Sequence, residues 1–195
     1  MNLALFDFDG TLTSKDSLPD FIQYAVGKPA YYFGLILLSP VLLAYLTGLI
    51  RNDIAKQKLI ARYLKGWSFE RYQQVASDYS CSEIDKIVRL QAIEKLNWHQ
   101  QQGDRVIVVS ASMEDWLKPW CDNNGVELLA TRLMTENGII SGKFATPNCH
   151  GEEKVNRVME LLNLSDYDRI FAYGDSSGDS EMLALADEGF YRKFS

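Results

Sequence analysis

The sequence predicts an α/β fold in which an open parallel sheet is interrupted, after its first strand, by an all-helical segment. Short apolar runs typical of buried strands alternate with helical patterns between residue 103 and the end of the 195-residue chain. Another apolar run, 2–7, is followed by a long stretch, 14–100, in which every pattern is helical. We therefore expect a core formed by 1–13 and 101–195, into which 14–100 is inserted as a separate helical unit.

The first strand and the first helix have clear local signals. Residues 2–7 read Asn-Leu-Ala-Leu-Phe-Asp, an apolar run that ends in an acid and suits a buried strand. Asp16 stands shortly before Pro19, and a capping side chain ahead of a proline in the first turn predicts the start of a helix. Gly27 predicts its end.

The segment 31–50 is the most apolar part of the chain. Fifteen of its twenty residues are hydrophobic, and no charge occurs between Lys28 and Arg51. The run is long enough to be considered as a membrane span. Pro40 lies in its middle, however, and a proline removes a helical hydrogen bond, so we expect two short helices in a hairpin.

The period of the apolar residues changes where the core resumes. The rest of the insert is expected to form helices at 52–64, 68–79 and 82–101. Residues 105–110 are a continuous run rich in β-branched side chains, which predicts a central parallel strand. Ser112 is then expected to cap a helix that reaches Asn124 and is interrupted near Pro119.

The C-terminal half continues the alternation of strands and helices. Residues 127–131 predict a strand, and Asn137-Gly138 lies between two extended runs, 132–135 and 139–144, as in a hairpin. The remaining expected elements are a helix at 152–162, a strand at 169–173 and a helix at 179–186.

Composition excludes several classes of protein. The chain has 20 Lys and Arg against 26 Asp and Glu, a net charge of −6, which argues against a nucleic-acid partner because such a protein needs a concentrated basic face. The three cysteines are widely spaced and form no CxxC pair, so we expect a reducing compartment, the cytoplasm. The first ten residues contain no basic residue and are not expected to be a signal peptide.

Polar side chains gather where the expected strands end. In an open α/β sheet, ligands bind at the carboxyl ends of the strands. Acids, a hydroxyl and a lysine are therefore delivered to one edge of the sheet, which is not how a sheet buries apolar surface. The set consists of Asp7, Asp9, Ser110, Lys154, Asp175 and Asp179.

These residue types suit phosphoryl transfer. Several carboxylates at one site repel one another unless a cation holds them, and hard oxygen ligands are those that Mg²⁺ prefers. One carboxylate can attack phosphorus, while a second acid protonates the leaving oxygen and later activates water. A lysine and a hydroxyl can hold the phosphoryl oxygens, where charge lies in the transition state.

Four motifs, taken in order, resemble the haloacid dehalogenase (HAD) superfamily of phosphohydrolases. They are DFDGTLT at 7–13, VIVVS at 106–110, Lys154, and GDSSGD at 174–179. The helical insert resembles that of the phosphoserine-phosphatase-like branch, subfamily IB. The resemblance implies a Rossmann-like core and a helical C1-type cap over 14–100 that closes over the site. It also implies a Mg²⁺-dependent phosphatase acting through an aspartyl-phosphate on a small phosphorylated substrate, such as phosphoserine or a lipid phosphate.

The resemblance implies a role for each matching residue. Asp7 would be the nucleophile, and Asp9 the general acid and base. Mg²⁺ would be held by Asp7, the backbone carbonyl of Asp9, and Asp175, while Asp179 would support the metal or Lys154. The phosphoryl group would be bound by Thr11, Ser110, Ala111 and Lys154.

Several assignments stay open within this family. Asp16 falls where phosphoserine phosphatases place an acid that contacts the substrate amine, but it is also a simple helix cap. Gly178 and Ala111 depart from the motifs of those enzymes, which puts a serine-type substrate in doubt. His99 and His150 are expected at the surface, without a catalytic or metal-binding role.

The apolar segment has two interpretations in this frame. A single membrane span would separate Asp7 from the later motifs and destroy the site. In the first remaining interpretation, the segment packs inside the cap and also serves as a contact in a homo-oligomer. In the second, 31–65 contacts a membrane surface on its cytoplasmic face, because 51–65 has five basic residues against one acid.

Two rival functions use similar residues. Phospho-acceptor signalling domains also combine acids, a hydroxyl and a lysine in an α/β sheet, but they lack a second acid two residues after the first. A non-catalytic binding domain is the other alternative, and it is disfavoured because every motif position is filled.

Overall fold

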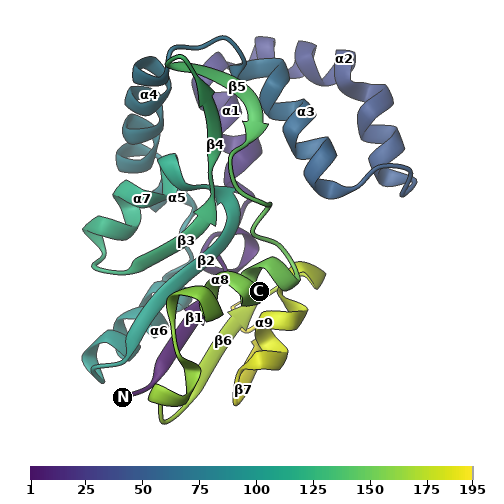
Figure 1. Ribbon diagram of the computed structural model, residues 1–195. Coiled ribbons are helices and arrows are strands. Elements are labelled where there is room, and N and C mark those ends of the chain that lie inside the picture. Colours follow the sequence, from purple (N-terminus) through teal and green to yellow (C-terminus); the bar gives the residue numbers. More distant parts are fainter. Residues whose placement is uncertain (195) are drawn as a thin grey trace.

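The computed structural model describes residues 1–194 and contains a five-stranded parallel sheet (Figure 1). The strand order is β3-β2-β1-β6-β7, and every neighbouring pair is parallel. The predicted α/β fold class is confirmed. The edge strand β7 was not predicted, because its sequence, Glu-Gly-Phe-Tyr, contains a glycine and has no continuous apolar run. The strands are β1 (Leu3–Phe6), β2 (Arg105–Met113), β3 (Glu127–Thr131), β6 (Ile170–Gly174) and β7 (Glu188–Tyr191).

Helices cover both faces of the sheet, and side chains alternate between the two faces along each strand. Ala4 and Phe6 of β1 belong to a core shared with α6 and α7, whereas Leu3 and Leu5 belong to one shared with α8 and α9. β1 and its neighbour β2 are therefore buried on both faces, which explains their continuous apolar sequence. The helices are α6 (Leu90–Gln101), α7 (Glu114–Asn123), α8 (Glu152–Leu161) and α9 (Ser180–Leu185).

The insert after β1 is helical, and its second helix corrects the expected hairpin. α2 is one continuous helix through Pro40. Pro40 has no N–H to donate to the carbonyl of Ile36, and the hydroxyl of Ser39 donates to that carbonyl instead, at 2.8 Å. The missing hydrogen bond at Pro40 therefore costs the helix less stability than the sequence pattern implied. The helices of the insert are α1 (Ser17–Val26), α2 (Lys28–Leu46), α3 (Asn52–Leu64), α4 (Phe69–Ser82) and α5 (Ile84–Ile87).

Two other helix predictions were wrong: one helix is divided in two, and another begins later than expected. The expected helix 82–101 is divided into α5 and α6, because the backbone N–H of Arg89 donates to the carbonyl of Leu12 and so leaves the helical ladder. Ser112 does not cap α7, and α7 continues through Pro119 instead of breaking there. Strand β2 continues past it to Met113, and the side chain of Ser112 turns toward the site described below.

The hairpin formed by β4 (Leu133–Glu136) and β5 (Ile139–Phe144) leaves the core and lies against the helical insert (Figure 1). The backbone N–H of Phe144 donates to the side chain of Gln57 in α3, at 3.2 Å. A side chain at Gly142 would collide with Ala61 of the same helix. The hairpin therefore packs with the helical insert, although it follows β3 in the second segment of the chain.

The expectation that His99 lies at the surface was wrong. Its ring is fully buried, with Nδ1 at 2.8 Å from Asp104 and Nε2 at 2.9 Å from the hydroxyl of Tyr173. Burial lowers the pKa of His99, so the neutral ring is favoured. The residue links α6 to β6 and packs against one face of the sheet, away from the edge at which ligands bind. His150 is exposed, as expected.

Candidate active site

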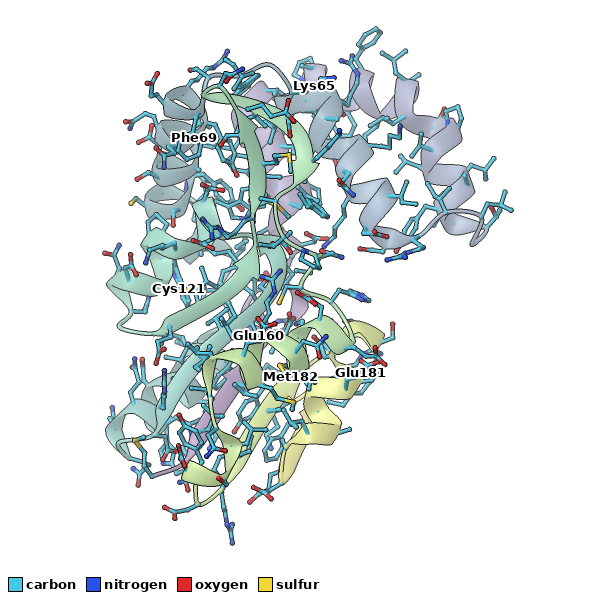
Figure 2. All side chains as sticks on the ribbon, in the orientation of Figure 1. Lys65, Phe69, Cys121, Glu160, Glu181 and Met182 are labelled. Carbon is cyan, nitrogen blue, oxygen red and sulfur yellow. The ribbon has the colours of Figure 1, made fainter. Side chains whose placement is uncertain are left out.

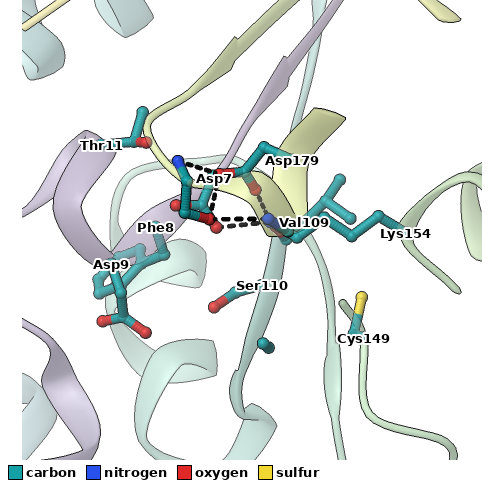
Figure 3. Close-up of polar contacts among 12 residues, drawn as sticks. Asp7, Phe8, Asp9, Thr11, Val109, Ser110, Cys149, Lys154 and Asp179 are labelled. Atoms are coloured by element: carbon teal, nitrogen blue, oxygen red, sulfur yellow. Dashed lines mark hydrogen bonds and ion pairs between the residues drawn. The ribbon is translucent and has the colours of Figure 1, made fainter. Parts of the chain in front are cut away.

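Asp7 stands directly after β1 and is held by the neighbouring strand. Its backbone N–H donates to the carbonyl of Tyr173, which continues the β1–β6 ladder by one residue and leaves the carboxylate at the edge of the sheet. Nζ of Lys154, near the start of α8, donates to Asp7 at 2.5 Å, to Asp179 at 2.6 Å and to the carbonyl of Val109 at 2.7 Å (Figure 3). The structure thus joins all four sequence motifs in one contact.

The charged groups in this contact are buried, and their pKa values depend on one another. Lys154 is 2% exposed. Burial would lower its pKa, but Asp7 and Asp179 outweigh burial and raise it, so the ammonium form is held. Burial raises the pKa of Asp7 to about 7, although Lys154 opposes the shift. For Asp179, Lys154 and the Ser176 donors overcome burial and keep the pKa below its usual value. Asp179 is therefore the permanent counter-ion of the lysine.

Asp9 lies across the site from this ion pair and has its own donors. Its carboxylate accepts the backbone N–H of Ser17 at 2.7 Å and the hydroxyl of Ser112 at 2.5 Å. The hydroxyl of Ser17 donates to Ser112 and itself accepts the indole N–H of Trp116. Burial raises the pKa of Asp9 to about 6, and the nearby Asp16 contributes in the same direction. The carboxyl group can therefore be protonated closer to neutral pH than an ordinary aspartate.

Ser17 and Ser112 were not predicted as partners of Asp9. They lie 95 positions apart in the sequence, and Ser112 was expected to cap a helix instead. The turn Phe8–Leu12 carries Asp9 toward them. Each contact depends on the tertiary arrangement of α1, β2 and that turn.

Asp175 follows β6 and faces the Phe8–Leu12 turn. The hydroxyl of Thr11 donates to its carboxylate at 3.1 Å. Gly10 has φ +85°, and a side chain there would meet the Asp175 carboxylate at 2.4 Å. The glycine is therefore needed for its backbone conformation and for the space it leaves. Burial raises the pKa of Asp175.

Three carboxylates converge in the way that a metal ion requires. Oxygen atoms of Asp7, Asp175 and Asp179 all lie within 4.8 Å of one another. Lys154 supplies one positive charge against these three acids, and hard oxygen donors suit Mg²⁺. The donor set therefore fits a divalent cation. The side chain of Asp9 points to Ser17 and Ser112, so the backbone carbonyl of Asp9 is the group left for the ligand role implied by the sequence.

Ser110 and Ala111 lie where β2 reaches the same edge. The hydroxyl of Ser110 is buried and accepts the backbone N–H of Ser112 at 3.0 Å. Ala111 lines the pocket that contains Asp7 and Asp9. Cys149 is buried nearby, and burial raises the pKa of its thiol to about 11, so it stays protonated and has no part in the chemistry.

A pocket of about 400 Å³ opens over these residues. Its floor comes from the strand ends of the core, and its opposite wall comes from the insert. Asp16, which caps α1 through a 2.9 Å bond from the N–H of Leu18, also lines the pocket, so both of its expected roles remain compatible with the structure. The lining residues to which the sequence assigned no role in the site are Ser14, Lys15, Tyr45, Asn52, Lys56, His150, Ser176 and Ser177.

The family model for haloacid dehalogenase-like hydrolases matches residues 4–184. The chain belongs to this family. The match covers β1 to α9, and thus every residue assigned above to the pocket floor. The family that the four motifs predicted is confirmed.

Other proteins resemble this hydrolase along nearly its whole length. Protein CicA of Caulobacter vibrioides is 36% identical over 194 residues, which cover 98% of this chain and 86% of that protein. A histidinol-phosphatase of Neisseria meningitidis is 28% identical, with coverage of 96% and 88%.

Solved structures share the fold. A protein of unknown function from Bordetella pertussis has a TM-score of 0.80 at 24% identity, covering 95% of this hydrolase and 86% of that chain. A substrate-bound phosphoserine phosphatase has a TM-score of 0.62 at 21% identity, with coverage of 95% and 82%. At these identities the likeness shows a common fold, which agrees with the predicted phosphoserine-phosphatase-like architecture.

Proposed function

We propose that the protein hydrolyses phosphate monoesters, with Asp7 as nucleophile and Asp9 as general acid and base. The observation that carries this proposal is the placement of the two carboxyl groups. Asp7 is held by Lys154 at the floor of the pocket, and Asp9 lines the same pocket with a raised pKa. A retained aspartyl-phosphate, as in a signalling domain, would have no use for the second acid.

The reaction has two balanced steps. A carboxylate oxygen of Asp7 attacks phosphorus, the bond to the leaving oxygen breaks, and that oxygen takes the proton of Asp9. A water oxygen then attacks the aspartyl-phosphate, its proton passes to the Asp9 carboxylate, and the bond between phosphorus and Asp7 breaks. Inorganic phosphate and the starting protonation state of Asp9 result. The Ser17 and Ser112 donors hold Asp9 in place for both transfers.

We propose Mg²⁺ as the cofactor, held by the Asp7 and Asp175 carboxylates and the Asp9 carbonyl. When bound, the ion would neutralise charge on the phosphoryl oxygens. Lys154 and Ser110 would bind the same oxygens beside Ala111. Thr11 donates to Asp175, so it would position that ligand through its hydroxyl and reach the phosphoryl group through its backbone. Asp179 would keep Lys154 charged.

We propose that residues 14–100 form the cap that selects the substrate, except for α6, which packs on the sheet and belongs with 1–13 and 101–195 to the catalytic core. Lys15 and Lys56 add positive charge to the pocket wall, and Asn52 and Tyr45 add polar groups. This lining favours a leaving group that is polar and carries negative charge. Phosphoserine, whose leaving group carries a carboxylate, meets that description, as does a phosphorylated metabolite or lipid phosphate whose leaving group keeps a second anionic group. We also propose that the protein acts in the cytoplasm, where its three free cysteines stay reduced.

The mechanism is tested with p-nitrophenyl phosphate and Mg²⁺. We expect Asp7→Asn to reduce hydrolysis to background, while Asp122→Asn, on the surface of α7, keeps the wild-type rate. Asp9→Asn should release p-nitrophenolate in a burst of one equivalent and then stall. This leaving group departs without a proton, but hydrolysis of the aspartyl-phosphate needs the base. Steady hydrolysis by Asp7→Asn would exclude the mechanism.

Substrate choice is tested by Lys56→Met. We expect this variant to raise KM for phosphoserine and other anionic phosphate esters, and to leave KM for p-nitrophenyl phosphate unchanged, because p-nitrophenol carries no second anion. An equal effect on all substrates would mean that Lys56 does not select the leaving group. A panel of phosphorylated metabolites and phospholipids on the wild-type protein then identifies the substrate.

A further inference from the structure

The outer face of α2 is apolar and unprotected. The helix has 19 residues, is long and apolar enough to cross a bilayer, and has only 17% of its most apolar window buried. Isolated exposed apolar side chains are normal, but a continuous face of them marks an interaction site. Figure 2 shows side chains projecting outward along this helix. Those exposed by more than half of their area are Tyr32, Phe33, Ile36, Leu37, Leu43 and Leu46.

The inner face of α2 is committed to the cap. A side chain at Gly34 would collide with Tyr63 of α3, and the Tyr63 hydroxyl donates to the carbonyl of Tyr31 at 2.5 Å. α2 also packs on α1, so both of its ends return to helices of the same unit (Figure 1). A helix held in this way cannot cross a bilayer, but it can lie on one.

Positive charge accompanies the apolar face. Arg51, Lys58, Arg62 and Lys65 are exposed, and their spacing along α3 places them on one side of that helix. Asp53 is the sole acid among residues 51–65, and its carboxylate is occupied by Arg51 at 3.0 Å. Leu49, which is 79% exposed, lies in the turn between the apolar and the basic helix. The cap thus combines apolar and basic surface in a molecule whose net charge is −6.

We propose that α2 docks on a membrane surface that contains anionic phospholipid, with its outer face among the upper acyl chains and the basic side of α3 at the headgroups. Apolar area and basic charge together are what interfacial helices use to bind such surfaces. A second copy of the chain would also cover α2. The basic side chains of α3 would then need acidic partners, but Asp53, the sole acid of 51–65, is already paired with Arg51.

Docking would place the pocket beside the lipid surface. Tyr45 in the last turn of α2, Asn52 and Lys56 all line the pocket and lie next to the docking face in the sequence. The inference does not depend on the phosphatase mechanism, because binding to vesicles requires no turnover.

The test is co-sedimentation with vesicles of phosphatidylcholine alone, or mixed with phosphatidylglycerol. The apolar variant is Ile36→Ser with Leu43→Ser, at positions 68% and 63% exposed and outside the pocket. Its matched control is Leu90→Ser with Met159→Ser, at positions 71% and 57% exposed on the core. The charge variant is Lys58→Gln with Arg62→Gln. Circular dichroism and hydrolysis of p-nitrophenyl phosphate report whether each variant is folded.

We expect wild-type protein and the core control to bind the phosphatidylglycerol vesicles alike. The apolar variant should bind at least about tenfold more weakly, because two buried aliphatic side chains are lost. The charge variant should bind roughly fivefold more weakly for each charge removed. Added salt should also weaken binding of the wild type, because it screens the attraction between the basic side chains and the anionic lipid.

Three results would overturn the proposal: no wild-type binding at low salt, an equal loss in the core control, or equal binding to neutral vesicles that is insensitive to the charge variant. A wild-type dimer that Ile36→Ser with Leu43→Ser converts to a monomer, in a protein that ignores vesicles, would assign the face to a second copy instead. Loss of hydrolysis in Asp7→Asn with vesicle binding intact would separate this inference from the proposed mechanism.

Discussion

Replacing Lys154 by methionine tests whether this lysine holds the site together. The side chain is 2% exposed and donates to two carboxylates and a carbonyl. Methionine keeps most of the volume but leaves Asp7 and Asp179 buried without their cation. Breaking a buried ion pair by removing one partner costs about 3–5 kcal/mol, so the unfolding equilibrium constant should rise by roughly two to three and a half orders of magnitude.

The loss should also depend on pH with a defined sign. Burial already raises the pKa of Asp7 to about 7 while Lys154 opposes the shift, so removing the lysine raises it further. The folded variant then binds protons that the unfolded chain, with carboxyl pKa values near 3.8, does not hold. The variant is therefore stabilised as pH falls, and the difference from wild type should be larger at pH 8 than at pH 5.

Urea unfolding followed by circular dichroism, with EDTA present, measures this difference. EDTA is needed because a divalent cation would partly replace the lost charge. Lys118→Met is the matched control. Its ion pair with Asp122 is 2.8 Å long but exposed, and such pairs contribute about 0–1 kcal/mol. A loss of stability in Lys154→Met as small as in this control, or one independent of pH, would refute the reasoning.

Two further predictions concern the Phe8–Leu12 turn and the buried histidine. Gly10→Ala and Gly48→Ala should each lose about 1–2 kcal/mol because both have positive φ, but Gly10→Ala alone should lose hydrolysis, since its side chain meets Asp175 whereas Gly48 has open space. Equal hydrolysis by the two variants would contradict this. For His99, burial lowers the pKa, so below about pH 6.5 the unfolded chain binds a proton that the folded chain resists. In urea titrations, the difference in unfolding free energy between wild type and His99→Asn should therefore decrease as pH falls from 7.5 to 5.5. A constant difference would mean that the pKa of His99 is the same in the folded and unfolded protein.

Local patterns were enough to place most elements and the acids at their ends. β1 is recognisable because both of its faces are buried and all of its residues are therefore apolar. Asp7 is charged, so it marks the point where the buried strand ends. Pro40 shows the limit of such reasoning. A proline predicts a break, but a neighbouring serine hydroxyl satisfies the freed carbonyl and the packing of Gly34 on Tyr63 keeps the helix in place.

By itself, the sequence determined the α/β class, the helical insert and the chemical identity of the acids, hydroxyl and lysine at the strand ends. These follow from residue type and local period, which short stretches of chain carry. Tertiary structure alone decided that Ser17 and Ser112 hold Asp9, that Asp179 rather than Asp175 shares Lys154, and that α2 exposes its apolar face. None of these contacts lies within a single helix or strand. No local pattern therefore records which side of a helix is exposed or which donor from another element is used.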